Sequence, residues 1–148
     1  KGIGRADVVI EAIVEKLDIK QKLFADLEAK AKPGAVLATN TSSLKLSDIA
    51  QPMQDPSRLI GLHFFSPVAM MPLVEVVQGD ATRTSEVEKG AAFVTAIGKF
   101  PLVTKDVPGF LVNKVLTPYM FAAMARLEKG EDKEKIDEAV RTFGMPMG

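Results

Sequence analysis

Two residues of types that exchange protons stand out in the sequence, His63 and Glu75. His63 is the only histidine of the 148 residues, and Glu75 follows it twelve positions later. Both lie in short apolar runs, 59–65 and 73–77, of the kind that buried strands show. If these runs pair antiparallel around Ala69, the imidazole and the carboxylate face each other. A carboxylate there fixes the tautomer of the ring and stabilises its protonated form, as a positioned general base requires.

A structural interpretation of the same pair stays open. A lone histidine in an apolar strand is more often a satisfied core residue than a base, and a lone glutamate at a sheet edge is often structural too. With period-two alternation, Glu75 shares a face with the apolar Leu73 and Val77. The pair alone therefore does not decide between catalysis and packing, and the rest of the chain has to.

The composition indicates an ordered globular protein. Hydrophobic residues make up 47% and charged residues 26% of the chain, which suits one domain or one and a half small ones. The formal net charge is zero with interspersed charges, so we expect neither a nucleic acid nor an anionic membrane as partner. With no cysteine and one histidine, the sequence predicts no disulfide and no metal site. No apolar run is long enough to span a bilayer.

Apolar runs predict strands that alternate with helices over the first two thirds of the chain. The strands are expected at 8–10, 35–38, 59–65, 73–77 and 100–104, and the helices at 17–31, 46–50 and 84–97. We expect Ser47 or the preceding serines to cap the second helix, and Thr84 or Ser85 to cap the third. This order predicts an α/β domain built of crossover units.

The pattern becomes helical in the last third of the chain. Residues 110–127 are almost continuously apolar, with an expected kink at Pro118, and 131–143 predicts a charged helix. No strand pattern appears there. We therefore place a domain boundary between an α/β part, 1–106, and a helical part, 107–148.

Polar residues follow the first two predicted strands. Glu11 and Glu15 follow the first, with Lys20 one turn further along the next helix, and the cluster 40–43 follows the second. Because ligands bind at the carboxyl ends of parallel strands, these groups and His63 suggest one shared crevice. The alternatives are a solvated helix start for the first set and simple helix capping for the cluster.

Asn113 is a further candidate, because it lies within the apolar run 110–116. An amide in such surroundings costs free energy unless it finds partners. It either bonds locally or reaches from the helical part to a ligand in the crevice, and both interpretations stay open.

The 148 residues contain no glycine-rich phosphate loop. Gly2-Ile3-Gly4 lacks the preceding strand and the third glycine, so we reject it as a dinucleotide fingerprint. The chain starts at Lys1 without methionine, meets a strand pattern almost at once, and stops on Gly-Met-Pro-Met-Gly. We therefore expect a fragment of a longer protein.

Five motifs, in this order and at these spacings, resemble the 3-hydroxyacyl-CoA dehydrogenases: ADVVIEAIVE, NTSSL, GLHFFSPVAMMPLVEVV, KDVPGFLVNKVLTPY and FGMPMG. The resemblance covers nearly the whole chain. The last motif and the KGED segment are most similar to the dehydrogenase part of the multifunctional α-subunits of fatty-acid β-oxidation. The resemblance to the family implies the C-terminal half of a Rossmann-type NAD-binding domain, with the first βαβ unit missing, followed by the start of an all-α domain.

The resemblance implies a catalytic role for four residues. His63 matches the base that takes the 3-hydroxyl proton while C3 gives hydride to NAD, and Glu75 matches its carboxylate partner. Ser42 matches the serine near the reacting hydroxyl and the nicotinamide. Asn113 matches the asparagine that binds substrate near the reacting carbonyls.

Cofactor contacts are implied for a second set of residues. Glu15 and Lys20 match positions that contact the nicotinamide half of NAD, which Ser42 also approaches. Ser66 stands where many single-function members have asparagine, so its expected contact to cofactor or substrate depends on a hydroxyl in place of an amide.

The implied reaction is the NAD-dependent oxidation of (S)-3-hydroxyacyl-CoA to 3-ketoacyl-CoA, with acyl-CoA as the substrate. We expect a homo-oligomer or a place in a β-oxidation complex. The first alternative rests on the missing first strands, which would leave an open sheet edge that invites self-association. The expected location is cytoplasmic in a bacterium, and mitochondrial or peroxisomal in a eukaryote. The isolated chain is expected to be inactive, because it lacks the pyrophosphate-binding loop.

There are two rival interpretations of the function. One is a non-catalytic relative that keeps the fold as a binding or structural protein, as lens crystallins of this superfamily do; the joint presence of His63, Glu75, Ser42 and Asn113 argues against it. The other is an NAD-dependent dehydrogenase of small β-hydroxy acids, which the HFFSP and PGFLVN motifs disfavour.

Overall fold

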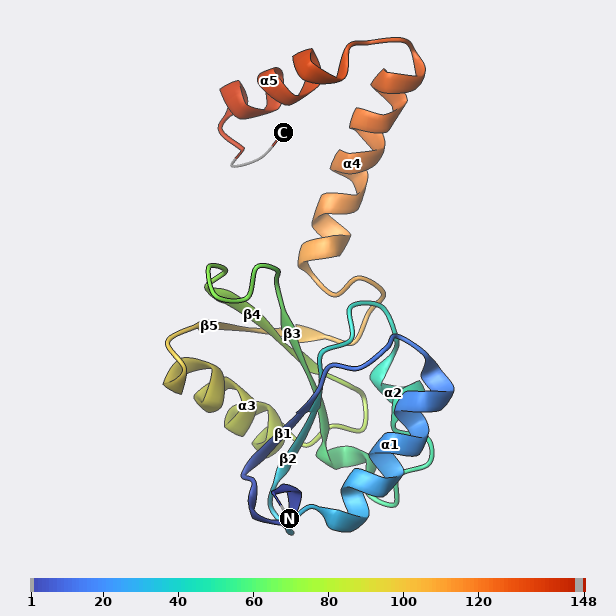
Figure 1. Ribbon diagram of the computed structural model, residues 1–148, viewed down its shortest axis with the longest axis vertical. Coiled ribbons are helices and arrows are strands. Elements are labelled where there is room, and N and C mark those ends of the chain that lie inside the picture. Colours follow the sequence, from blue (N-terminus) through green and yellow to red (C-terminus); the bar gives the residue numbers. More distant parts are fainter. Residues whose placement is uncertain (1, 146–147) are drawn as a thin grey trace. The chain divides into compact units, whose positions relative to one another are not determined.

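The computed structural model describes residues 2–145 and 148, which form two compact units. The units meet in the sequence between Leu111 and Val112, and they are called unit 1 and unit 2 here. Within the described residues, every strand belongs to unit 1, and unit 2 is helical (Figure 1).

Unit 1 is built on a five-stranded sheet in the order β1-β2-β3-β4-β5. β1, β2 and β3 are parallel, whereas β4 pairs antiparallel with β3 and parallel with β5. All five predicted strands are confirmed, with ends that differ by at most one residue. The carboxyl ends of β1, β2 and β3 therefore share one edge of the sheet. The strands are β1 (Val8–Glu11), β2 (Val36–Thr39), β3 (Leu59–Phe64), β4 (Leu73–Gln78) and β5 (Phe100–Lys105).

Helices cover both faces of this sheet, as the α/β prediction requires (Figure 1). α1 (Leu17–Lys30) and α2 (Leu46–Ile49) cover one face, and α3 (Thr84–Ala96) covers the other. The alternation of side chains along each strand feeds two buried clusters: Leu59 packs in the one beneath α1 and α2, and its neighbour Ile60 in the one beneath α3. Both faces are thus apolar, which leaves polar groups to the strand ends.

The predicted helix caps are wrong. Ser47 lies inside α2, Thr84 and Ser85 lie inside α3, and neither helix has a side-chain cap at its N-cap residue. The amide of Leu46 instead donates to Asp106 Oδ2 at 2.8 Å. Burial raises the pKa of Asp106, against the opposing effect of this hydrogen bond. A partner sixty residues away satisfies the first turn of α2, and local sequence patterns do not reveal such a partner.

Unit 2 contains α4 (Val112–Glu128) and α5 (Lys133–Phe143), which confirms both predicted helices. Pro118 lies within α4. The Asp132 side chain caps α5 by accepting hydrogen bonds from the second and third helical amides, and Gly144 ends the helix at a φ of 113°. In the described part of the chain, no helix is long and apolar enough to cross a membrane.

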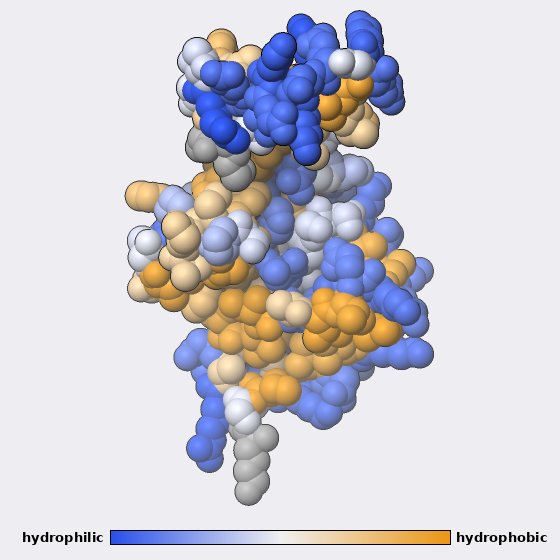
Figure 2. Space-filling view, turned by 45° about the horizontal axis from the view of Figure 1, so that its top comes forward, coloured by the Kyte–Doolittle hydropathy of each residue, from blue (hydrophilic) through white to orange (hydrophobic). Residues whose placement is uncertain are grey.

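Hydrophobic side chains also reach the surface of unit 1. Ile13 and Val14 follow the edge strand β1, and Val68 and Met70 lie between β3 and β4; all four are exposed. Figure 2 shows hydrophobic areas in orange among the hydrophilic surface. Self-association through the edge strand β1 stays a prediction.

Candidate active site

The antiparallel pairing of β3 and β4 places His63 directly opposite Glu75. The imidazole Nδ1 lies 2.7 Å from Glu75 Oε2, and the two residues are 7% and 0% exposed. The predicted facing arrangement is confirmed. Because a carboxylate oxygen accepts hydrogen bonds, Nδ1 donates, and in the neutral ring the other nitrogen, Nε2, carries the lone pair. The ring is therefore held as a base whose free nitrogen is Nε2.

The surroundings hold the pair in place. The amide of Leu111 donates to Glu75 Oε1 at 2.9 Å, so hydrogen bonds reach both carboxylate oxygens. Two aromatic rings pack on the imidazole: Phe65 at a centroid distance of 4.6 Å and Phe110 at 5.5 Å, tilted by 56° and 60°. These contacts exclude water from most of the pair, which strengthens its hydrogen bonds.

A second buried charge cluster lies at the end of β1. Lys20 Nζ lies 2.7 Å and 2.8 Å from the two oxygens of Glu11, and Thr39 Oγ1 donates to Glu11 Oε2 at 2.7 Å. Glu11 is 4% exposed and Lys20 is 1% exposed. A solvated helix start is therefore the wrong interpretation of these two residues. They form a buried ion pair that ties β1 to α1 and β2.

Glu15 connects this cluster to the loop after β2. Its Oε2 lies 3.1 Å from Lys20 Nζ, and its Oε1 accepts hydrogen bonds from the Thr41 hydroxyl and the Ser42 amide. Partial burial alone would raise the pKa of Glu15, but the hydrogen bonds from Thr41 and Lys20 and the Lys20 charge outweigh it and lower that pKa. Glu15 is therefore an ionised carboxylate whose side chain stays 38% exposed.

The strand ends meet as predicted. Asn40 Oδ1 accepts a hydrogen bond from the Phe64 amide at 2.8 Å, which ties the end of β2 to the end of β3 one residue beyond His63. Ser42 is exposed at the same edge of the sheet. The sequence identifies the cluster 40–43 as polar, and the family resemblance assigns a role within it only to Ser42. The particular roles of Asn40 and Thr41 were missed, and their place after a buried strand was the available signal.

The two remaining predicted residues are Ser66 and Asn113. Ser66 is exposed in the connection that follows β3. Asn113 belongs to α4 of unit 2, where it is half-buried and its carbonyl oxygen accepts a hydrogen bond from the Thr117 hydroxyl at 2.7 Å. The ligand contacts expected of both residues stay predictions.

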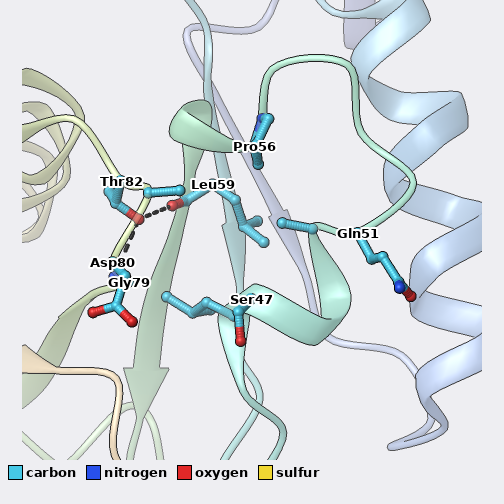
Figure 3. Close-up of a pocket in the computed structure, with 10 residues that line it drawn as sticks. Ser47, Gln51, Pro56, Leu59, Gly79, Asp80 and Thr82 are labelled. Atoms are coloured by element: carbon cyan, nitrogen blue, oxygen red, sulfur yellow. Dashed lines mark hydrogen bonds between the residues drawn. The ribbon is translucent and has the colours of Figure 1, made fainter.

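A pocket of about 220 Å³ lies elsewhere in unit 1, between α2 and the loop after β4 (Figure 3). Thr82 braces its wall by donating to the Leu59 carbonyl at 2.7 Å and accepting from the Gly79 amide at 3.1 Å. None of the predicted site residues lines it. We therefore do not assign the chemistry of His63 to this pocket.

A largely parallel sheet, covered on both faces and with polar groups at its carboxyl edge, defines an α/β protein of the dinucleotide-binding type. Residues 1–107 match the family model described as 3-hydroxyacyl-CoA dehydrogenase, NAD binding domain, and residues 109–148 match its C-terminal domain. The chain belongs to the 3-hydroxyacyl-CoA dehydrogenase family. The predicted resemblance, the Rossmann-type fold class and NAD as the cofactor of the matched domain are confirmed.

Curated relatives include multifunctional and single-function proteins. The fatty acid oxidation complex subunit alpha of Vibrio cholerae is 48% identical over 147 residues, which are 99% of this chain and 21% of that protein. The probable 3-hydroxyacyl-CoA dehydrogenase B0272.3 of Caenorhabditis elegans is 49% identical over 145 residues, 97% of this chain and 47% of that protein. The chain thus spans between a fifth and about half of these relatives.

Solved structures agree with the fold. FadB2 of M. tuberculosis superposes with a TM-score of 0.94 at 37% identity, covering 99% of this chain and 53% of that one. The 3-hydroxybutyryl-CoA dehydrogenase of Escherichia coli gives a TM-score of 0.94 at 43% identity, covering 99% and 32%. The arrangement of strands and helices described above is therefore that of the family.

Proposed function

We propose that the chain forms part of an NAD-dependent 3-hydroxyacyl-CoA dehydrogenase that interconverts (S)-3-hydroxyacyl-CoA and 3-ketoacyl-CoA in fatty-acid β-oxidation. The observation that carries the proposal is the buried His63–Glu75 pair, with Nδ1 2.7 Å from Oε2, in a chain of this family. A secondary alcohol gives up hydride readily only if its hydroxyl proton leaves as well. A histidine held by a carboxylate supplies the base for that proton.

In the oxidation direction, His63 Nε2 takes the proton of the 3-hydroxyl group while carbon 3 loses hydride. NAD supplies the hydride acceptor when it is bound. Glu75 keeps the ring oriented through Nδ1 and stabilises the imidazolium that forms. In the reduction direction the imidazolium returns the proton to the 3-keto oxygen, so the pair serves both directions.

Glu15 fits the sugar hydroxyls of a dinucleotide. Its carboxylate has a lowered pKa and a part-exposed side chain, so it is ready to accept a hydrogen bond from a hydroxyl group. Lys20 is enclosed between Glu11 and Glu15. We therefore propose that Lys20 contributes to NAD binding chiefly by holding Glu15, which refines the direct contact expected from the family.

Three residues complete the proposed site. Ser42 and Ser66 are exposed and offer hydroxyls to the cofactor or to the reacting oxygen of the substrate. Asn113 offers an amide to the substrate carbonyls from the helical domain. We also propose that 1–106 and 107–148 are partial versions of the NAD-binding domain and the helical domain of the family.

The proposed partners follow from the relatives. Several are named as the alpha subunit of a fatty acid oxidation complex, so we propose an acyl-CoA substrate and a place in such a complex or in a homo-oligomer. A cytoplasmic location in a bacterium, or an organellar one in a eukaryote, accompanies this proposal.

The test uses the product of the complete gene and measures acetoacetyl-CoA-dependent oxidation of NADH. We expect turnover, and we expect His63→Ala to lower kcat by about 10²–10⁴-fold, the usual contribution of a general base, while NADH binding is kept. Loss of NADH binding in His63→Ala would assign the histidine a structural role. NADH binding without turnover of any acyl-CoA would favour the non-catalytic relative, and turnover of small β-hydroxy acids alone would favour the other dehydrogenase.

The isolated 148-residue chain gives a second readout. It contains no glycine-rich pyrophosphate loop, so we expect no measurable turnover from it. Activity close to that of the complete gene product would contradict the role assigned to that loop.

A further inference from the structure

A strained segment precedes the end of unit 1. Gly109 has a φ of 76° and Phe110 a φ of 50°, and Phe110 is the one non-glycine residue with positive φ among those described. A bulky residue adopts the left-handed region only where its surroundings compensate for the strain, and such residues cluster at functional sites. The contacts that compensate for this strain are made by the Phe110 side chain and by the Leu111 amide.

Phe110 and the residue after it, Leu111, both contact the His63–Glu75 pair. The Phe110 ring, 2% exposed, lies 5.5 Å from the His63 imidazole at 60°. The Leu111 amide donates to Glu75 Oε1 at 2.9 Å. One residue thus covers the base with its side chain and, through its backbone conformation, aims the next N–H at the carboxylate.

The rest of the segment is fixed as well. The Phe110 amide donates to the Val107 carbonyl at 2.8 Å, and Asp106 accepts from Leu46 at the start of α2. The Phe110 side chain also belongs to the buried cluster beneath α1 and α2, together with Phe24. Residues 106–111 are therefore held at both ends by hydrogen bonds and by packing.

We propose that Phe110 is a positioning residue for the His63–Glu75 pair, which rests on the proposed function of that pair. Its left-handed backbone directs the Leu111 amide to Glu75 Oε1, so that Glu75 Oε2 stays aligned with Nδ1. Its ring limits the tilt of the imidazole and excludes water from it. Together these contacts keep the proton on Nδ1 and the lone pair on Nε2, the tautomer that the reaction requires.

The first test needs no activity, because His63 is the only histidine of the chain. Nitrogen-15 NMR of the imidazole, at a pH where the ring is neutral, reports which nitrogen carries the proton. We expect the Nδ1–H tautomer in the 148-residue chain, and a mixture with the Nε2–H tautomer in Phe110→Leu and in the milder Phe110→Met. Both substitutions remove the aromatic ring that packs on His63 while keeping an apolar side chain.

Phe24→Leu is the matched control, since Phe24 is 0% exposed, lies in the same buried cluster and belongs to no part of the site. We expect Phe24→Leu and Phe110→Leu to lower thermal stability to a similar degree, and only Phe110→Leu to shift the tautomer. An unchanged tautomer in both Phe110 variants, or an equal shift in Phe24→Leu, would assign Phe110 to core packing alone.

The second test is kinetic and uses the complete gene product. Phe110→Leu should lower kcat by up to about 10²-fold, the cost of misplacing a catalytic group by about 1 Å, with little change in NADH affinity. In a Glu75→Gln background the same substitution should cost almost nothing, because the alignment it protects is already lost. Equal losses in both backgrounds would overturn the proposal. Absence of turnover in the unsubstituted protein would refute the proposed function. The NMR result would then decide whether Phe110 positions the His63–Glu75 pair.

Discussion

Two clusters of ionisable residues lie at the carboxyl edge of the same sheet, one around Lys20 and one around His63. They differ in whether a nitrogen lone pair stays available to accept a proton. In the first, Lys20 bonds both oxygens of Glu11 and one of Glu15, while Thr39 adds a further donor to Glu11. In the second, Glu75 bonds His63 through Nδ1, and the imidazole keeps a lone pair on Nε2.

The comparison separates burial from function. The central pair of each cluster, Lys20–Glu11 and His63–Glu75, is buried and hydrogen-bonded, so burial alone does not identify the reactive cluster. Lys20 has no acceptor to offer, and its protons are shared among carboxylates that hold β1, α1 and the loop after β2 together. In the second cluster, the neutral imidazole keeps a nitrogen lone pair on Nε2 that can take a proton from a substrate hydroxyl. The first cluster should therefore control stability and the second should control catalysis.

Glu75→Gln gives the largest expected effect and tests whether the His63–Glu75 cluster controls catalysis. The amide is nearly isosteric, but it provides no charge to stabilise the imidazolium and can present an N–H to Nδ1, which favours the wrong tautomer. We expect kcat of the complete gene product to fall by about 10³–10⁴-fold, as in other carboxylate–histidine pairs. Steady-state NADH oxidation measures it, with circular dichroism to establish that the variant is folded. A loss under tenfold would remove Glu75 from the mechanism.

Lys20→Met tests whether the cluster around Lys20 controls stability. Removing the ammonium leaves Glu11 buried without its ion-pair partner, and such losses typically cost about 3–5 kcal/mol of the free energy of unfolding. Urea unfolding of the 148-residue chain measures the change. Lys30→Met is the matched control, because its ion pair with Asp26 is more than half exposed and is worth at most about 1 kcal/mol.

A double substitution sharpens the result. Adding Glu11→Gln to Lys20→Met removes the stranded charge, so part of the stability should return. Equal losses in Lys20→Met and Lys30→Met, or no recovery in the double variant, would contradict the assignment of this cluster to stability.

The sequence predicts the fold well because the fold depends on patterns that are local. Apolar runs and their breaks gave all five strands to within one residue, and the spacing of His63 and Glu75 predicted their register around a central turn. The catalytic pair was predictable for the same reason, since two strands joined by one short connection have few ways to pair.

The missed features depend on contacts between distant segments. Asp106 caps α2 from the end of β5, where a local serine was expected. Lys20 is buried because Glu11 and Glu15 lie around it, although lysines are usually solvated. No local pattern distinguishes Phe110 from the other apolar residues near it. Its left-handed backbone and its contact with His63 arise only when β5 returns beside β4.

Glu15→Gln gives the smallest expected effect and tests whether the first cluster also responds to pH. The pKa of Glu15 is lowered in the folded chain, so its carboxylate stabilises the fold above its unfolded pKa of about 4.5, and this contribution is lost as the pH falls through the lower, folded value. Stability of the 148-residue chain should therefore fall less steeply below pH 4.5 in Glu15→Gln than in the unsubstituted chain. Urea unfolding at a series of acidic pH values measures the slope. Gln also weakens the contact to Lys20, so the two curves should differ at neutral pH and converge in acid. Parallel curves would show that Glu15 titrates alike in the folded and unfolded chain, and that the loop after β2 is held without its charge.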